Sequence, residues 1–327
     1  MKESPPLSGK IREWPRTSIP PATSLLIVVP TTPVCWQKAA THQAAAELIE
    51  QALELAPLWA AGWFRLGEYS EKAGQHDNAV KAYEKVAELD SEGIFAAPLK
   101  LAVLGAAETP EQPPSRYVEG LFDDYADRFE TSLVKKLDYS VPEKLAALIE
   151  TARPEGKRFR CAVDIGCGTG LLGVEICDWT ERLEGFDIST NMLAKAEEKG
   201  IYHHLSQADL SLDEDTSGLF ADGLQKGRAD LVAAADVMMY LGSLETVMPL
   251  VIALLQPGGL FAFSVEDAGD EGGFILQPSL RYAHSQTYVS NLLAAFGMEI
   301  LQIRKTIIRK DAGKPLSGIL FLARKPA

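Results

Sequence analysis

The chain has 327 residues, of which 46% are hydrophobic and 24% are charged, values ordinary for one or two globular domains. Its formal net charge is −13, and a surface of that sign repels phosphate backbones, so nucleic acid is not the expected substrate. The longest apolar run near the start, residues 25–29, is too short for a signal sequence or a membrane span. The four cysteines show neither CxxC spacing nor a nearby histidine. We therefore expect a cytoplasmic protein without a membrane segment, a disulfide framework or a metal site.

The first part of the chain divides into a leader and a helical region. Residues 1–36 are rich in proline and are predicted to be a disordered leader. Residues 37–108 have helical spacing, and the W-x2-L-G motif at Trp63 followed by the A-x3-Y motif at Ala79 fits a tetratricopeptide repeat. Gly67 is expected where the two antiparallel helices of the repeat cross. A plain helical hairpin is the alternative, and either structure predicts a platform for a substrate or a protein partner rather than a catalytic centre.

A linker and a second domain follow. Residues 109–116 (TPEQPPSR) have the composition of a linker. Residues 117–327 then alternate short apolar runs with helical stretches, which predicts a parallel sheet with helices on both faces. The loop between the last two runs is too short for a helical crossover, so the sheet should end in an antiparallel hairpin. The expected strands are Cys161–Ile165, Leu183–Phe186, Tyr202–Ser206, Asp230–Ala235, Leu260–Val265, Met298–Arg309 and Ser317–Ala323.

A glycine-rich loop directly follows the first expected strand. Its sequence is VDIGCGTG, in which Asp164 ends the strand and the turn contains Gly166, Gly168 and Gly170. Glycine lets the backbone approach a ligand closely and adopt a positive φ, and the helix N-terminus behind the turn is slightly positive. The loop therefore predicts a site for a nucleotide-like cofactor.

Two cofactors compete for this loop. Residues 168–173 match GxGxxG, the dinucleotide fingerprint, so a NAD-dependent oxidoreductase is an open alternative. Three features oppose NAD: Gly166 adds an earlier glycine, Asp164 would place a carboxylate against the pyrophosphate, and the expected hairpin is foreign to the dinucleotide-binding sheet. S-adenosylmethionine has no phosphate and carries a cationic amino group and a sulfonium. An acidic, glycine-lined pocket therefore favours S-adenosylmethionine.

Carboxylates recur at the ends of the later strands. Asp187 follows the second strand, Asp209 the third and Asp236 the fourth. The carboxyl ends of parallel strands share one crevice, so these side chains should converge there. Asp187 is placed to accept hydrogen bonds from two ribose hydroxyls, and Asp209 to accept one from the adenine amino group. Each could instead cap a helix or close a turn.

These motifs resemble those of class I methyltransferases: VDIGCGTG (163–170), GFDIS (185–189), QAD (207–209) and LLQPGG (254–259). Residues 45–325 further resemble predicted methyltransferases with tetratricopeptide repeats, through LFDDYADRF (121–129) and RYAHS (281–285). The resemblance implies an α/β fold, a class I methyltransferase Rossmann-like sheet with a C-terminal antiparallel hairpin, preceded by an all-α tetratricopeptide-like helical domain. It implies S-adenosylmethionine as the cofactor, adds Ile188 to the cofactor-binding residues, and places Tyr125 and Phe129 over the adenosine as a lid. It names no acceptor.

The acceptor is therefore expected to be a small molecule or a protein. Methyl transfer is an in-line displacement in which the protein mainly aligns the nucleophile with the methyl group. A hydroxyl or acid acceptor would also gain from a general base, for which His284, Tyr240 and Asp236 are the candidates. A lone histidine such as His284 can also be structural. An adaptor that has lost its activity is the third hypothesis, opposed by the intact glycines and by Asp164 and Asp187.

Overall fold

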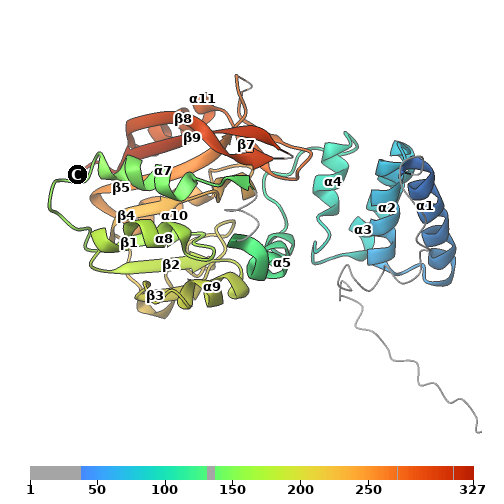
Figure 1. Ribbon diagram of the computed structural model, residues 1–327, viewed down its shortest axis with the longest axis horizontal. Coiled ribbons are helices and arrows are strands. Elements are labelled where there is room, and N and C mark those ends of the chain that lie inside the picture. The colour runs from blue at the N-terminus through green and yellow to red at the C-terminus, as the bar shows by residue number, and fades with distance from the viewer. Residues whose placement is uncertain (1–37, 131–136, 271, 312) are drawn as a thin grey trace, which may run out of the picture. The chain divides into compact units, whose positions relative to one another are not determined.

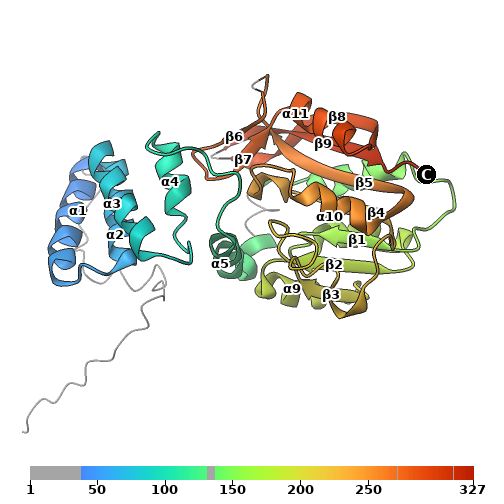
Figure 2. The same ribbon diagram turned by 180° about the vertical axis from the view of Figure 1, so that it is seen from behind.

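The computed structural model describes residues 38–130, 137–270, 272–311 and 313–327. The chain divides into two compact units between Ser91 and Glu92. The first unit is helical and the second combines helices with a large sheet (Figures 1 and 2). The predicted leader, residues 1–36, lies outside the described residues. Within the described part of the chain, every helix is too short or too polar to cross a membrane.

The described residues of the first unit, 38–91, form the helices α1 (Lys38–Leu55), α2 (Ala60–Lys72) and α3 (His76–Leu89). Tyr83 of α3 is fully buried, and a Cβ at Gly67 of α2 would overlap its ring. The predicted close crossing at Gly67 is therefore confirmed, and Tyr83 belongs to the core of the unit. Trp63 and Tyr69 are partly buried and pack against the same core.

The second unit is built on a nine-stranded sheet. Strands β3, β2, β1, β4 and β5 are adjacent in that order and parallel. Strand β9 pairs antiparallel with β5 and with β8, and the β6–β7 hairpin joins the far end of β5. The bounds of the strands are β1 Ala162–Ile165, β2 Leu183–Asp187, β3 His204–Gln207, β4 Ala229–Ala234, β5 Leu255–Asp267, β6 Phe274–Leu276, β7 Tyr282–His284, β8 Glu299–Asp311 and β9 Lys314–Arg324.

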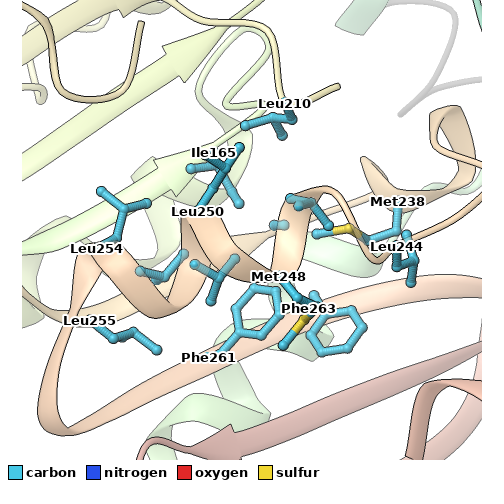
Figure 3. Close-up of a cluster of buried hydrophobic side chains, with 14 of the residues drawn as sticks. Ile165, Leu210, Met238, Leu244, Met248, Leu250, Leu254, Leu255, Phe261 and Phe263 are labelled. Atoms are coloured by element: carbon cyan, nitrogen blue, oxygen red, sulfur yellow. The ribbon is translucent and has the colours of Figure 1, made fainter. Parts of the chain in front are cut away.

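Helices cover both faces of the sheet because successive strand residues point to opposite sides. Phe261 and Phe263 pack under α10 (Val247–Leu254) and α11 (Gln286–Ala295), as Figure 3 shows for α10. Leu260 and Ala262 face the opposite core, which α7 (Val141–Glu150) and α8 (Leu171–Ile176) cover. The helix α9 (Thr190–Glu197) follows β2, and short 3-10 turns lie at η3 (Cys177–Trp179), η4 (Ala221–Gly223) and η5 (Met238–Tyr240).

The predicted fold class is confirmed: the sheet is mostly parallel and ends in an antiparallel hairpin, after an N-terminal helical region. The sequence analysis missed the β6–β7 hairpin. Both of its strands have three residues, too few to show a repeating apolar pattern.

The division between the units lies earlier than the predicted linker. Residues 109–116 belong to the second unit, where the Tyr282 hydroxyl donates a hydrogen bond to the Pro110 carbonyl at 2.9 Å and the Ser243 N–H donates to the Glu111 carbonyl at 2.7 Å. Just upstream, Leu99 of α4 (Ala97–Val103) is fully buried in a cluster with Tyr282. The proline content suggested a free linker, but these segments are fastened to the sheet domain.

A fragment that begins at Glu92 should therefore fold as well as the second unit does in the whole chain. A fragment that begins at Ser115 loses the burial of Leu99 and the hydrogen bonds of residues 110 and 111, which together should lower the free energy of unfolding by about 3–5 kcal/mol. Thermal melts followed by circular dichroism compare the two fragments. Equal melting temperatures would show that α4 and residues 109–114 contribute nothing to this unit.

Candidate functional site

A cavity of about 370 Å³ lies in the second unit, at the edge of the sheet where the parallel strands β1 to β4 end. The helix α5 (Ser115–Tyr125) and the turn η2 (Ala126–Arg128) precede α7, and side chains of α5 line the cavity. This is the crevice in which the sequence analysis expected its carboxylates to converge. The predicted site residues that line it are Gly166, Gly168, Asp187, Ile188, Asp209, Tyr125, Asp236 and Tyr240.

The glycine-rich loop is fastened to strand β2 by its backbone. Gly166, Gly168 and Gly170 have φ angles of 68°, 54° and 86°, in the left-handed region that favours glycine. The Gly166 N–H donates a hydrogen bond to the Phe186 carbonyl at 2.6 Å, and the Gly168 N–H donates to Asp187 Oδ2 at 2.8 Å. The loop and the second strand therefore hold one another in place at the edge of the cavity.

The three glycines differ in the space around them. A Cβ at Gly166 would overlap the side chain of Val237, and one at Gly170 would contact Tyr202 at 3.0 Å. Gly168 lines the cavity, and a Cβ there meets open space. Gly170 lies outside the cavity, where it caps the N-terminus of α8. Gly168 is thus the position where the backbone lies open to a ligand.

Two buried carboxylates flank the loop. Asp187, 7% exposed, accepts a second hydrogen bond from the Ser189 N–H at 2.9 Å, and burial raises the pKa of Asp187 to about 6. Asp164 accepts a hydrogen bond from the Tyr202 hydroxyl at 2.8 Å and borders a smaller hollow behind the loop; burial raises its pKa to about 7. Each oxygen of Asp187 keeps a lone pair after its backbone bond, so the carboxylate can still accept ligand hydroxyls.

The third strand end contributes Asp209. Its Oδ1 accepts hydrogen bonds from the N–H and the hydroxyl of Ser211, at 2.9 and 2.6 Å, while both residues line the cavity. Asp209 therefore closes a turn, which was the alternative prediction for this residue. The other carboxylate oxygen of Asp209 accepts no hydrogen bond from the described residues. Ile188 lines the cavity beside Asp187.

An aromatic face of α5 and η2 lines the cavity. Phe122, Tyr125 and Phe129 are cavity residues, and Phe129 lies edge-on to Tyr125 with ring centroids 5.5 Å apart. Phe122 packs edge-on against Tyr240 at 4.9 Å. The predicted lid residues, Tyr125 and Phe129, are thus at the cavity with Phe122 beside them.

An acidic face of the same segment binds the rim of the cavity. Asp123 accepts a hydrogen bond from the Ser189 hydroxyl at 2.6 Å, and Glu130 accepts one from the Thr169 hydroxyl at 2.8 Å. Further contacts are Glu119 with Gln207, Asp127 with Lys195, and Glu130 with Lys199. This segment therefore lies over the glycine loop and the start of α9 with its polar side bound and its aromatic side inward.

Asp236 follows β4 in the left-handed region, with φ at 59°. Its carboxylate is paired with the Arg309 guanidinium and accepts a hydrogen bond from the Ser264 hydroxyl at 3.2 Å. Burial raises the pKa of Asp236, and the Arg309 charge opposes that rise. Asp236 lines the cavity as predicted, but its carboxylate is occupied by a cation that hinders its use as a base.

Tyr240 lines the cavity from η5, and its hydroxyl has no hydrogen-bond partner in the described part of the chain. Burial raises the pKa of Tyr240 to about 12, although the nearby Arg281 and Arg309 lower it. At neutral pH this hydroxyl therefore keeps its proton and is a hydrogen-bond donor that faces the cavity.

The hypothesis that His284 is a general base is not supported by its position. His284 is fully buried in β7, outside the cavity, with its ring stacked on Tyr288 at 5.9 Å. Its Nε2 donates a hydrogen bond to the Gly242 carbonyl at 2.8 Å, and burial lowers the pKa of His284 to about 4. This is the structural role that the sequence analysis held as the alternative.

Comparison with known families decides the class of protein. A family model described as a methyltransferase domain matches residues 137–303, just over half of the chain. The chain belongs to the methyltransferase-domain family. A tetratricopeptide repeat model matches residues 60–92, all but the last of which lie in the first unit, so the predicted repeat is confirmed as well. The cavity described above lies in the unit that contains the methyltransferase domain.

Curated relatives of this methyltransferase domain act on different molecules. The ubiquinone biosynthesis O-methyltransferase of Burkholderia multivorans is 26% identical over 148 residues, 44% of this chain and 60% of the relative. The trans-aconitate 2-methyltransferase of Delftia acidovorans is 34% identical over 116 residues, 34% of this chain and 40% of the relative. The match thus spans 60% or less of the length of either relative.

Solved structures share the fold. The 4+2 cyclase SpnF has a TM-score of 0.50 and 16% sequence identity, with 67% of this chain and 98% of that chain covered. An S-adenosylmethionine-dependent methyltransferase from Mesorhizobium loti has a TM-score of 0.42 and 21% identity, with 55% and 96% covered. At these identities the likeness concerns the fold, which can support more than one reaction.

Sequence reasoning missed several cavity residues of the methyltransferase domain. Arg281 belongs to the RYAHS motif and Arg309 ends an expected strand, but neither position predicts a site residue; both line the cavity. Tyr139 lines it too, from the segment before α7. A signal existed for Arg309, which is a charged residue at the end of the expected strand Met298–Arg309. Arg281 precedes a strand that is too short to show an apolar pattern. The partner of Arg309, Asp236, lies 73 residues away in the sequence, which hid the pairing.

Proposed function

We propose that the chain is an S-adenosylmethionine-dependent methyltransferase that acts on a small-molecule or protein acceptor. The observation that carries this proposal is the loop at Gly168, where the backbone is bound to Asp187 and lies open to the cavity. A cofactor with a ribose and no phosphate fits this place, because the Asp187 carboxylate suits a ribose while Asp164, behind the loop, disfavours a pyrophosphate.

The residues around the cavity suit the parts of such a cofactor. Asp187 offers a charged acceptor for the two ribose hydroxyls, with Ile188 as an apolar neighbour for the base. One oxygen of Asp209 is available to accept a hydrogen bond from the adenine amino group. The aromatic ring of Tyr125 would cover the adenine. Gly168 gives access to the backbone. Above its pKa of about 7, Asp164 adds negative charge behind the loop, which favours a cationic ligand.

The protein's contribution to the reaction is alignment and exclusion of water. When bound, S-adenosylmethionine supplies a methyl group on a sulfonium whose C–S bond breaks as the acceptor's lone pair forms the new bond to carbon. The lid formed by α5 and η2 closes the cavity with its aromatic side, which keeps water from the reacting atoms. Tyr240 can donate a hydrogen bond that orients the acceptor, whereas Asp236 is held by Arg309 and positions its neighbours.

Two features support methyl transfer over the other hypotheses. A NAD-dependent oxidoreductase would place Asp164 near a pyrophosphate, which the Asp164 carboxylate would repel when ionised. An inactive adaptor would have no reason to keep the loop, both carboxylates and the lid contacts together. Membership of the methyltransferase-domain family points the same way.

The relatives and the repeats bear on the acceptor. One named relative is an O-methyltransferase of ubiquinone biosynthesis and the other is a methyltransferase of trans-aconitate, which supports a small-molecule acceptor here. The tetratricopeptide repeat supports a protein partner that binds the first unit, because such helices commonly present a peptide-binding surface. A cytoplasmic location stays a prediction.

The proposed activity is tested by transfer of label from methyl-labelled S-adenosylmethionine. The whole chain is incubated with fractions of a cell extract, small molecules apart from proteins, beside the Gly168→Val variant as a control that should not bind the cofactor. We expect label in a product from the wild-type protein and none from the variant. Equal labelling by both proteins, or no binding of the cofactor by the wild type, would refute the proposal.

A further inference from the structure

A chain of ion pairs ends at the wall of the cavity away from the glycine loop. Arg309, 5% exposed, binds Asp236 through Nη1 and Glu266 through Nη2. Glu266 also accepts a hydrogen bond from Arg281 Nε at 2.8 Å, and Arg281 Nη2 binds Asp311 at 2.7 Å. Five alternating charges thus run from β4 across β5 to the β6–β7 loop and β8.

The two arginines differ in whether a guanidinium N–H group remains available to a ligand. Arg309 is buried between two carboxylates and also donates a hydrogen bond to the Met239 sulfur, so its role is structural. Arg281 lines the cavity with 21% of its side chain exposed, and its Nη1 has no acceptor in the described residues. One edge of the Arg281 guanidinium is therefore held by protein while the Nη1 group is open to a ligand.

The surroundings of Arg281 add a second donor and an apolar shell. The Tyr240 hydroxyl, close enough to Arg281 for the charge to lower its pKa, is protonated and lacks a partner in the described part of the chain. Val118, Phe122 and Leu280 make the neighbouring wall apolar. A ligand that covered Arg281 with only apolar atoms would leave a buried, charged N–H group without an acceptor, which is costly.

We infer that Arg281 and Tyr240 bind a carboxylate of the methyl acceptor, whose remaining body is apolar. This inference rests on the proposed function and deepens it. A carboxylate matches a guanidinium better than a neutral amide does, because charge-assisted hydrogen bonds are roughly twice as strong. Arg281 is then a specificity-determining residue, fixed in place by Glu266 and Asp311.

The amino-acid part of S-adenosylmethionine carries a carboxylate too, and the test separates the two sources. The cofactor end of the cavity is formed by the loop at Gly168 and by Asp187, whereas Arg281 comes from the β6–β7 loop beyond β5. Affinity for S-adenosylhomocysteine should therefore be the same in the wild type and in Arg281→Gln. A loss in that variant of tenfold or more, with methylthioadenosine binding unchanged, would assign Arg281 to the cofactor and overturn the inference.

The direct experiment titrates acid and amide pairs into the protein saturated with S-adenosylhomocysteine. Benzoate, cinnamate and 2-naphthoate are each compared with the matching carboxamide by calorimetry. At least one acid should bind roughly tenfold or more tightly than its amide. Arg281→Gln should bring the two affinities within about threefold by weakening the acid alone, and Arg281→Lys should restore part of the difference.

Two further variants keep the result interpretable. Tyr240→Phe leaves the ion pairs intact and should weaken acid binding by about three- to tenfold, even if Arg281→Gln folds poorly. Arg304→Gln, which removes an exposed arginine of β8 outside the cavity, should change nothing. Acids and amides that bind equally, or a failure of every acid to bind while S-adenosylhomocysteine binds, would overturn the inference and leave the proposed function standing. A wild-type protein that does not bind S-adenosylhomocysteine would refute the proposed function itself.

Discussion

Gly168→Val should abolish binding of S-adenosylmethionine, with an affinity loss of at least about a hundredfold. Gly168 lines the cavity, its N–H is bound to Asp187, and a Cβ there points into open space. A branched side chain fills the space through which the cofactor must approach the backbone. Calorimetric titration with S-adenosylhomocysteine measures the loss.

The strain of the substitution has a matched control. Gly168 has a φ of 54°, so valine also costs about 1–2 kcal/mol of stability from the left-handed backbone. Gly297, after α11, has a φ of 71° with open space around it and lies outside the cavity. Gly297→Val should lose similar stability and retain full cofactor binding. If Gly168→Val binds normally, the loop is not the cofactor site.

Asp187→Ala should weaken cofactor binding by tenfold or more. Two ribose hydroxyls lose a charged acceptor, at about 1.5–3 kcal/mol for each hydrogen bond. Asp178→Ala removes an exposed aspartate outside the cavity and should leave the affinity unchanged. A deoxyribose analogue should lose less affinity in Asp187→Ala than in the wild type, and equal losses would place Asp187 away from the ribose.

The same carboxylate predicts a pH dependence. Burial, with a smaller contribution from the Asp123 carboxylate of the lid, raises the pKa of Asp187 to about 6. The group is charged above that pH and protonated below it, so cofactor affinity should fall as the pH drops through about 6. Asp187→Asn should flatten the profile there, and Asp123→Asn should move the midpoint to lower pH. An affinity that is constant from pH 8 to pH 5 would show that the charge of Asp187 is not used.

The site residues that could be predicted are those whose neighbours in the sequence indicate their position. The loop at 163–170 and the aspartate after β2 each follow an apolar strand directly, so their place at the edge of the sheet follows from the order of elements alone. The cavity accordingly contains Gly166, Gly168, Asp187 and Asp209.

The parts that were missed depend on contacts between distant segments. Asp123 of the lid accepts a hydrogen bond from Ser189, 66 residues later in the sequence, and nothing near Asp123 indicates this contact. Arg281 reaches the cavity because the short β6–β7 hairpin extends the sheet at β5. His284 was proposed from its residue type, but burial among aromatic rings leaves it without access to a ligand.

The predicted linker and the division into two compact units do not coincide. Residues 109–116 have the composition of a linker, yet their carbonyls accept hydrogen bonds from Tyr282 and Ser243. Proline restricts the backbone but does not prevent a segment from contacting its neighbours. Composition alone therefore could not distinguish a segment that is hydrogen-bonded to the sheet domain from a free linker.

Direct titration of cofactors tests the central claim, because every assignment at the cavity assumes S-adenosylmethionine as the ligand. The whole chain and the fragment from Glu92 are each titrated calorimetrically with S-adenosylmethionine, S-adenosylhomocysteine and NADH at pH 8. We expect both proteins to bind the first two ligands with similar affinities below a millimolar dissociation constant and to give no heat of binding with NADH. Saturable binding of NADH together with no binding of S-adenosylmethionine or its demethylated product would contradict the account.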